Sequence, residues 1–148
     1  MESVPRDLLW NRGWEGVLSA AHGAGGHAAA EVARRCSEFA LGRTARVWAQ
    51  VGPVEAPVVE WLRDSGRASS SEEQRALVEM VPRAGHLAAV RHPARTARAL
   101  MVRQAYARAF CAVLESETGA STEIRIAADP RPSRPAVAEV AAEPAPGG

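Results

Sequence analysis

The stretch ARTARALMVRQAYARAFCAVLESE, residues 94–117, determines the fold that the sequence predicts. Its large apolar side chains cover most of a helical wheel instead of forming one stripe: Leu100, Met101, Val102, Tyr106, Phe110, Val113 and Leu114. A helix that is apolar nearly all round is typical of the buried centre of a domain. We therefore expect this helix to be central and the remaining helices to pack around it.

Helical periodicity also marks the N-terminal part of the chain. Trp10, Trp14, Leu18 and Ala21 recur at the spacing of one helix face. The cluster Gly-Ala-Gly-Gly at residues 23–26 is expected to end that helix, because consecutive flexible residues cost backbone entropy in a helix. His22 then lies at its C-terminus as a capping residue, and a second helix follows from about His27, with a kink or break near Gly42 and a rotated stripe through Leu41, Ala45 and Trp48.

Two further helix starts are predicted in the middle of the chain. Pro57 suits the first turn of a helix that carries Val58, Trp61 and Leu62 and ends at Gly66. Ser71 and Gln74 have the spacing of a capping box, so the best-defined helix start is expected there. Pro82 would kink or split that helix, because proline lacks the backbone N–H that the helix needs.

The C-terminal segment has a different composition. Residues 123–126 alternate weakly like a strand, which is too short to be stable without a partner. From Asp129 onward five prolines occur among alanines, with too few large apolar groups to compensate for ordering. The predicted fold is therefore all-α: a single helical bundle-like domain of five or six helices at residues 1–118, with a mostly disordered Pro/Ala-rich tail at residues 119–148.

Composition restricts the possible classes of protein. A chain of 148 residues fits one domain, and its 18 basic residues are all arginine, which excludes chemistry at a lysine amine. The N-terminus lacks a basic segment followed by an apolar one, and no apolar run is long enough to span a bilayer. We expect a cytoplasmic protein with no membrane partner, in which Cys36 and Cys111 are small buried hydrophobes.

Charge is distributed unevenly although the net charge is only +1. Residues 80–114 contain six arginines and no acidic residue. One interpretation is a surface that binds an anion or a partner; the other is that these arginines pair with glutamates of neighbouring helices or are simply solvated. The candidate residues for the first interpretation are Arg83, Arg91, Arg95, Arg98 and Arg103.

Motifs for catalysis or metal binding are not recognisable. The glycine cluster is followed by no P-loop lysine, and the chain contains no HExxH or CxxC pattern and no nucleophile elbow. His27 and Glu31 are one helical turn apart, and His22, His86, His92 or a cysteine could join them only through folding. The sequence thus predicts no enzyme, no catalytic residue, no cofactor and no metal site.

The functional expectation follows from these features. Trp10 and Trp14, if exposed, would mark a partner surface; otherwise they belong to the core. We expect a non-enzymatic helical protein-interaction or regulatory module, either an adaptor or a self-associating protein, whose partner is another protein or a second copy. The alternatives are a nucleic-acid-binding regulator that uses the Arg-rich segment 83–108, and a small helical metal-binding protein or enzyme.

Overall fold

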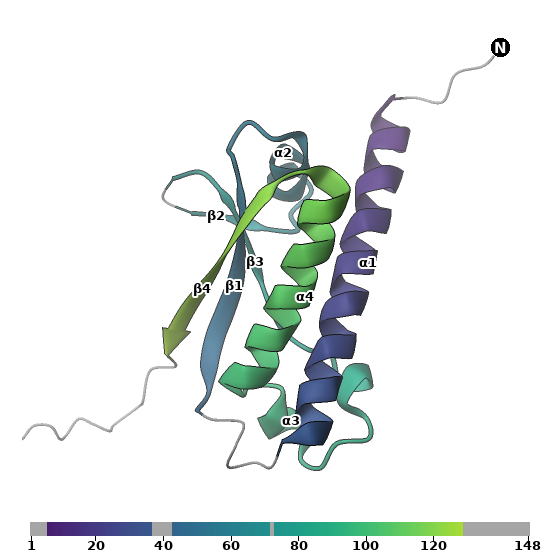
Figure 1. Ribbon diagram of the computed structural model, residues 1–148. Helices are drawn as coiled ribbons and strands as arrows, with labels where there is room; N and C mark the ends of the chain where they lie inside the picture. Colours follow the sequence, from purple (N-terminus) through teal and green to yellow (C-terminus); the bar gives the residue numbers. More distant parts are fainter. Residues whose placement is uncertain (1–5, 37–42, 72, 129–148) are drawn as a thin grey trace, which may run out of the picture.

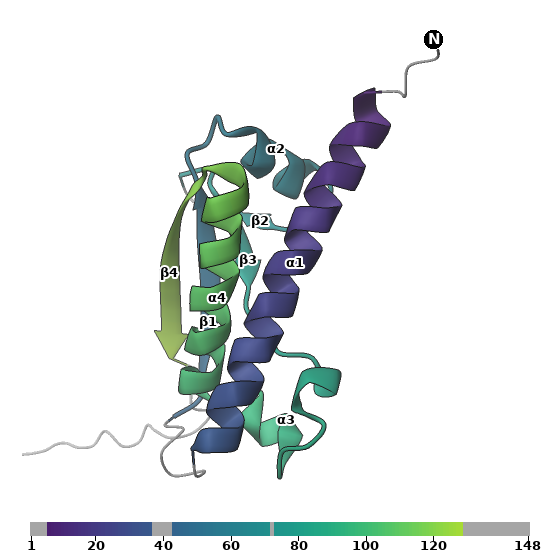
Figure 2. The same cartoon turned by 45° about the vertical axis from the view of Figure 1, so that its right-hand side comes forward.

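A computed structural model describes residues 6–36, 43–71 and 73–128. Three layers are stacked: a four-stranded antiparallel sheet, then helix α4, then helix α1 (Figures 1 and 2). The elements in chain order are α1 (Arg6–Arg35), β1 (Ala45–Gly52), α2 (Pro57–Asp64), β2 (Ser69–Ser70), β3 (Ala76–Glu79), the 3-10 turn η1 (Ala84–Leu87), α3 (Pro93–Thr96), α4 (Leu100–Thr118) and β4 (Ser121–Ala128).

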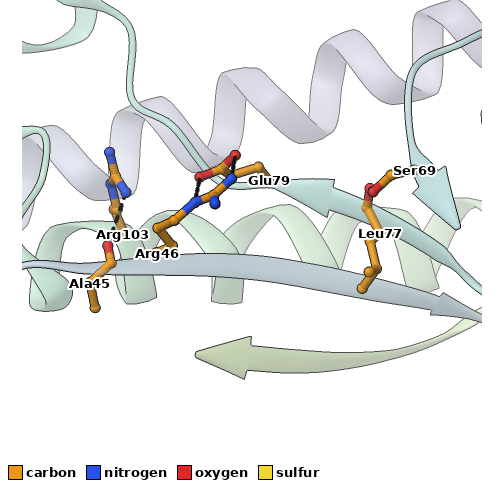
Figure 3. Close-up of polar contacts among 6 residues, drawn as sticks. All are labelled: Ala45, Arg46, Ser69, Leu77, Glu79 and Arg103. Atoms are coloured by element: carbon orange, nitrogen blue, oxygen red, sulfur yellow. Dashed lines mark hydrogen bonds and ion pairs between the residues drawn. The ribbon is translucent and has the colours of Figure 1, made fainter. Parts of the chain in front are cut away.

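The sheet has the strand order β2-β3-β1-β4. Along β1, Val47, Ala49 and Val51 are fully buried on the face that α4 covers. Ala49 lies opposite Val78 of β3 and Ile124 of β4, so the register keeps apolar side chains on that face. On the opposite face, Arg46 pairs with Glu79 through two hydrogen bonds of 2.9 Å (Figure 3).

Helix α4 is the central element, as its apolar wheel predicts, but it begins at Leu100 and not at residue 94, because Ala99 is extended and α3 precedes it as a separate short helix. Tyr106, Phe110 and Leu114 follow at intervals of one turn and are almost completely buried. Arg103 is also buried and stabilises the start of the helix. Its guanidinium donates to the carbonyl oxygen of Ala97 at 2.7 Å, and to that of Ala45 at 2.9 Å (Figure 3). The helix therefore contacts the sheet on one side and α1 on the other.

Helix α1 continues through the glycine cluster, so the predicted helix end at residues 23–26 is wrong. The reason is close packing: a Cβ on Gly25 would lie 2.6 Å from the Tyr106 ring, and one on Gly26 would overlap the His86 ring. Glycine in a helix interior costs stability relative to alanine. Here that cost permits two rings to approach the helix backbone.

The all-α fold class, with five or six helices in a bundle, is also wrong, because four segments form the antiparallel sheet. The sequence spacing of Ala45 and Trp48 predicts a helix in this segment. The same residues belong to a segment in which every second side chain from Ala45 to Val51 is fully buried, which is the period of a strand. The helix interpretation failed because alanine and single valines suit either period.

The predicted capping box is a turn instead of a helix start. The Gln74 N–H donates to the Ser71 carbonyl at 2.9 Å, and the Ser71 hydroxyl accepts from the Arg75 N–H at 3.0 Å. Gln74 has a φ of 68°, which a continuing helix excludes. The serine thus satisfies a backbone donor as predicted, but in the hairpin between β2 and β3. Pro82 follows β3 and kinks no helix.

The predicted helix at Pro57 is present, whereas the predicted end of the folded domain at residue 118 is not. Helix α2 begins at Pro57 and buries Val58, Trp61 and Leu62, which confirms the prediction, and Gly66 follows it with a φ of 77°. Strand β4 lies within residues 119–148, so the sheet extends beyond the boundary expected at residue 118. The Gly42 kink and residues 129–148 lie outside the described residues, and disorder of that tail stays a prediction.

The packing at the glycine cluster predicts how alanine substitutions there change the free energy of unfolding. Replacement Gly25→Ala should lower the free energy of unfolding by about 1–3 kcal/mol, because the new methyl group overpacks against a buried ring that has no room to move. Gly23→Ala is the matched control in the same cluster, where the added Cβ meets nothing within 4 Å. It should raise the free energy of unfolding by about 0.5–1 kcal/mol. Urea denaturation measures both, and stabilisation by both changes would contradict the packing argument.

Candidate functional site

A polar pocket lies beside the middle of α1, and we call it the histidine pocket. Its volume is about 350 Å³. Leu18 and Gly23 contribute to its wall. Its polar lining comes from three parts of the chain: Glu15, Ser19 and His22 from α1, Arg67 from the segment after α2, and Arg83 and His86 from η1 and the residue before it.

The helix period places the α1 residues on one side. Glu15, Ser19 and His22 are separated by four and three positions, so they follow one face of the helix. The unbroken helix keeps His22 opposite Tyr106 of α4, since α1 and α4 pack along each other (Figure 2).

His22 is hydrogen-bonded to a buried tyrosine of α4. Its Nδ1 and the Tyr106 hydroxyl share a hydrogen bond of 2.6 Å, and its ring lies 4.8 Å from the ring of Phe110. Burial lowers the pKa of His22, and the positive charges of Arg83 and His86 lower it further. Burial also raises the pKa of the Tyr106 hydroxyl, against the opposing effect of Arg83. Both groups are therefore held in their neutral forms at neutral pH.

His86 occupies the space that Gly26 leaves. Its ring meets the edge of the Tyr106 ring, with centroids 6.4 Å apart. The Nδ1 atom of His86 is buried and has no hydrogen-bond partner within the described part of the chain. Most buried polar side-chain atoms in proteins have a partner, and an exception is typical of a functional site or of a position that a water or ligand completes.

The pocket carries a net positive charge. At its edge, Glu15 forms an ion pair with Arg67, whose guanidinium also stacks over the Trp61 ring at 4.9 Å. The carboxylate of Glu15 is therefore compensated within the lining. Arg83 forms no ion pair with a carboxylate of residues 6–36, 43–71 or 73–128. Its charge is the one that the lining leaves uncompensated.

The structure separates the five arginines that the sequence singled out. Arg83 lines the pocket, whereas Arg103 is buried and holds α4 to β1. Arg91, Arg95 and Arg98 are exposed, in and beside α3. In the described part of the chain, the ion pairs of Glu15, Glu31 and Glu79 join these glutamates to arginines outside residues 80–114.

The structure describes the side chain of only one of the two aromatic candidates. Trp14 is half-buried and packs against the core, while the side chain of Trp10 lies outside the described part. Sequence reasoning missed the histidine pocket because the rest of its polar lining, Arg67, Arg83 and His86, is distant from α1 in the chain. The usable local signal was the spacing of Glu15, Ser19 and His22, which places them on one helix face.

Among the described residues, no group of three or more His, Cys, Asp or Glu side chains is arranged to hold a metal ion. No helix in the described ranges combines the length and apolarity needed to cross a bilayer. In comparisons with known proteins, no family model matches the chain, and no curated protein or solved structure shows a significant match.

The low pKa of His22 predicts a specific pH dependence of stability. Between the unfolded value of about 6.5 and the lower folded value, the unfolded state binds more protons than the folded state. Stability should therefore be fully present above about pH 6.5 and decline as the pH falls toward the folded pKa. In His22→Gln, which keeps a hydrogen-bonding group near Tyr106 but does not titrate, this decline should be smaller.

Denaturant unfolding at a series of pH values between about 7.5 and 5 measures the effect. His27→Gln, at an exposed position of the same helix, is the control and should retain the wild-type decline. An unchanged decline in His22→Gln would show that His22 does not cause it.

Proposed function

We propose that this protein is a non-enzymatic interaction module, with an adaptor or regulatory role, whose histidine pocket binds an anionic side chain of a protein partner. The observation that carries the proposal is the uncompensated charge of Arg83 in a pocket that also contains His22 and His86. Guanidinium and imidazole groups together supply directional N–H donors, which suit a carboxylate or a phosphorylated side chain.

The size of the pocket supports this class of ligand. A volume of about 350 Å³ is at the small end of the range of ligand sites, so it suits one or two side chains of a peptide. Arg67 is already held by Glu15 and Trp61, which preorganises one wall of the pocket. A partner would therefore bind a site with one wall preorganised by the Glu15–Arg67 ion pair and with Arg83, the residue before η1, as its cation.

The arrangement favours binding over hydrolysis. Ser19 and His22 lie on one face of α1 with a carboxylate nearby, which has the composition of a catalytic triad. In a triad, however, the carboxylate orients the histidine. Here the Nδ1 of His22 is taken by the Tyr106 hydroxyl, and Glu15 is engaged by Arg67. Because Tyr106 and not a carboxylate bonds the Nδ1 of His22, this arrangement does not activate Ser19 as a nucleophile.

A nucleic-acid-binding function remains the second candidate, with fewer residues than the sequence indicated. Arg91, Arg95 and Arg98 are exposed within eight positions of one another, and no acidic residue occurs between residues 80 and 114. Phosphate contacts of this kind would make binding fall steeply with salt. Arg83 and Arg103 would not contribute, because one lines the pocket and the other is buried.

We also propose a cytoplasmic location. The two cysteines, Cys36 and Cys111, are both free thiols, and burial raises the pKa of the Cys111 thiol. Unpaired structural cysteines are typical of reducing compartments.

A peptide titration tests the anionic-ligand proposal. Adding a tetraglutamate peptide to the full chain should shift the NMR signals of the His22 and His86 imidazoles in a saturable manner. Arg83→Gln should weaken this binding by about tenfold, since a charge-assisted hydrogen bond contributes about 1.5 kcal/mol. Inorganic phosphate in a parallel titration distinguishes a preference for phosphate from one for carboxylate.

Arg108→Gln is the matched control, because Arg108 is an exposed arginine of the same basic block that does not line the pocket. It should leave the affinity within about twofold. Equal weakening by both variants would reduce the effect to general charge, and no saturable shift with either probe would overturn the proposal. Salt-sensitive binding of single-stranded DNA that requires Arg95 and Arg98 would instead support the second candidate.

A further inference from the structure

Within residues 6–36, 43–71 and 73–128, no strand pairs with the outer edge of β4, where the Thr122 N–H donates to the Glu115 carboxylate. In the order β2-β3-β1-β4, β4 lies at the end of the sheet and pairs only with β1, over eight residues (Figure 1). The strand at the other end, β2, has only two residues. A long edge strand presents a row of backbone N–H and C=O groups to which another strand can be added.

The backbone groups that face this edge can be identified. The Thr122 N–H donates to the Glu115 carboxylate at 3.0 Å, so it points away from β1. Backbone groups of successive residues alternate between the two edges of an antiparallel strand. The N–H and C=O groups of Ile124 and Ile126 therefore face the same open edge as those of Thr122.

The inward-facing side chains of β4 contain no protective charge. Ile126 remains 45% exposed at the end of the covered face, and Ile124 is half-buried. Edge strands that avoid pairing commonly place a charge or a proline at such positions. Thr122, Ile124 and Ile126 offer none, so this face of the strand is suited to continuation by another strand.

The charged side chains of β4 lie on the other face and have opposite signs. The Glu123 carboxylate accepts a hydrogen bond from Nε2 of the Gln50 side chain at 3.1 Å, and the Arg125 guanidinium donates to Oε1 of the same side chain at 2.6 Å. Gln50 is almost completely buried between them. Glutamine thus fixes a negative and a positive side chain two residues apart along the edge strand.

We propose that two copies of the chain pair through β4, antiparallel across a two-fold axis at Ile124. Antiparallel pairing through the open edge places even-numbered residues opposite each other. With Ile124 opposite itself, Glu123 of each chain lies opposite Arg125 of the other. Shifting the register by two residues in either direction would place Glu123 opposite Glu123, or Arg125 opposite Arg125.

Cross-strand pairs of opposite charge stabilise a sheet and like charges destabilise it, so the charges of β4 select one register. The axis relates two identical charge pairs, and this self-complementarity identifies a second copy as the occupant of the edge. The result is one continuous antiparallel sheet formed from both four-stranded sheets.

A charge-swap series tests the proposal by analytical ultracentrifugation of the full chain over a range of concentrations. The wild type should dimerise. Arg125→Glu should weaken the dimer at least about tenfold, because both symmetry-related pairs become repulsive. The double variant Glu123→Arg/Arg125→Glu restores opposite charges across the axis and should recover dimerisation, while circular dichroism verifies that each variant is folded.

Three results would overturn the proposal. A wild-type chain that stays monomeric at about 1 mM has no such interface, since this concentration corresponds to only about 4 kcal/mol of association free energy. A dimer that tolerates Arg125→Glu uses another surface. A folded double variant that remains monomeric would exclude the register centred on Ile124.

Discussion

The packing of α1 against α4 is the constraint on which the rest of the structure depends. Gly25 and Gly26 permit the Tyr106 and His86 rings to approach the α1 backbone more closely than any larger residue would allow. This approach buries Tyr106, and the buried hydroxyl in turn holds His22 through their hydrogen bond. The pocket thus depends on two glycines in α1, which leave space for these rings although glycine lowers the stability of a helix.

The same packing determines the electrostatics of the pocket. Because His22 and Tyr106 are desolvated together, burial favours the neutral form of each and leaves Arg83 as the charge that the pocket offers. A protonated His22 would place a second cation beside that guanidinium in a partly buried position. The geometry therefore favours an anion attracted by arginine and oriented by imidazole, and it separates this role from the buried Arg103, which serves the fold.

Sequence reasoning predicted the central position of α4 and the start of α2 at Pro57, because each has a strong local signal. The alternation at residues 123–126 is weak, and the sequence placed it in a tail expected to be mostly disordered, although it belongs to β4. Sequence reasoning failed at β1, where alternating alanine and valine suit both periods, and at Ser71, where the same hydroxyl chemistry caps a turn. It missed the continuation of α1 through residues 23–26 for one reason. A glycine cluster ends a helix when nothing packs on it and continues one when rings do, and that difference depends on His86 and Tyr106, which are 60 and 81 positions away from the glycines they contact.

The two proposals concern different elements. Strand β4 forms the edge of the sheet (Figure 1), whereas the histidine pocket is lined by residues of α1, of η1 and of the segment after α2, and by none of β4. Pairing through β4 would therefore leave both pockets of a dimer accessible. A partner with two anionic segments could then engage both, and the second contact would form at the high effective concentration that a shared scaffold provides. In that arrangement, modest affinity at each small pocket is compatible with tight overall binding, and dimerisation would itself regulate the interaction.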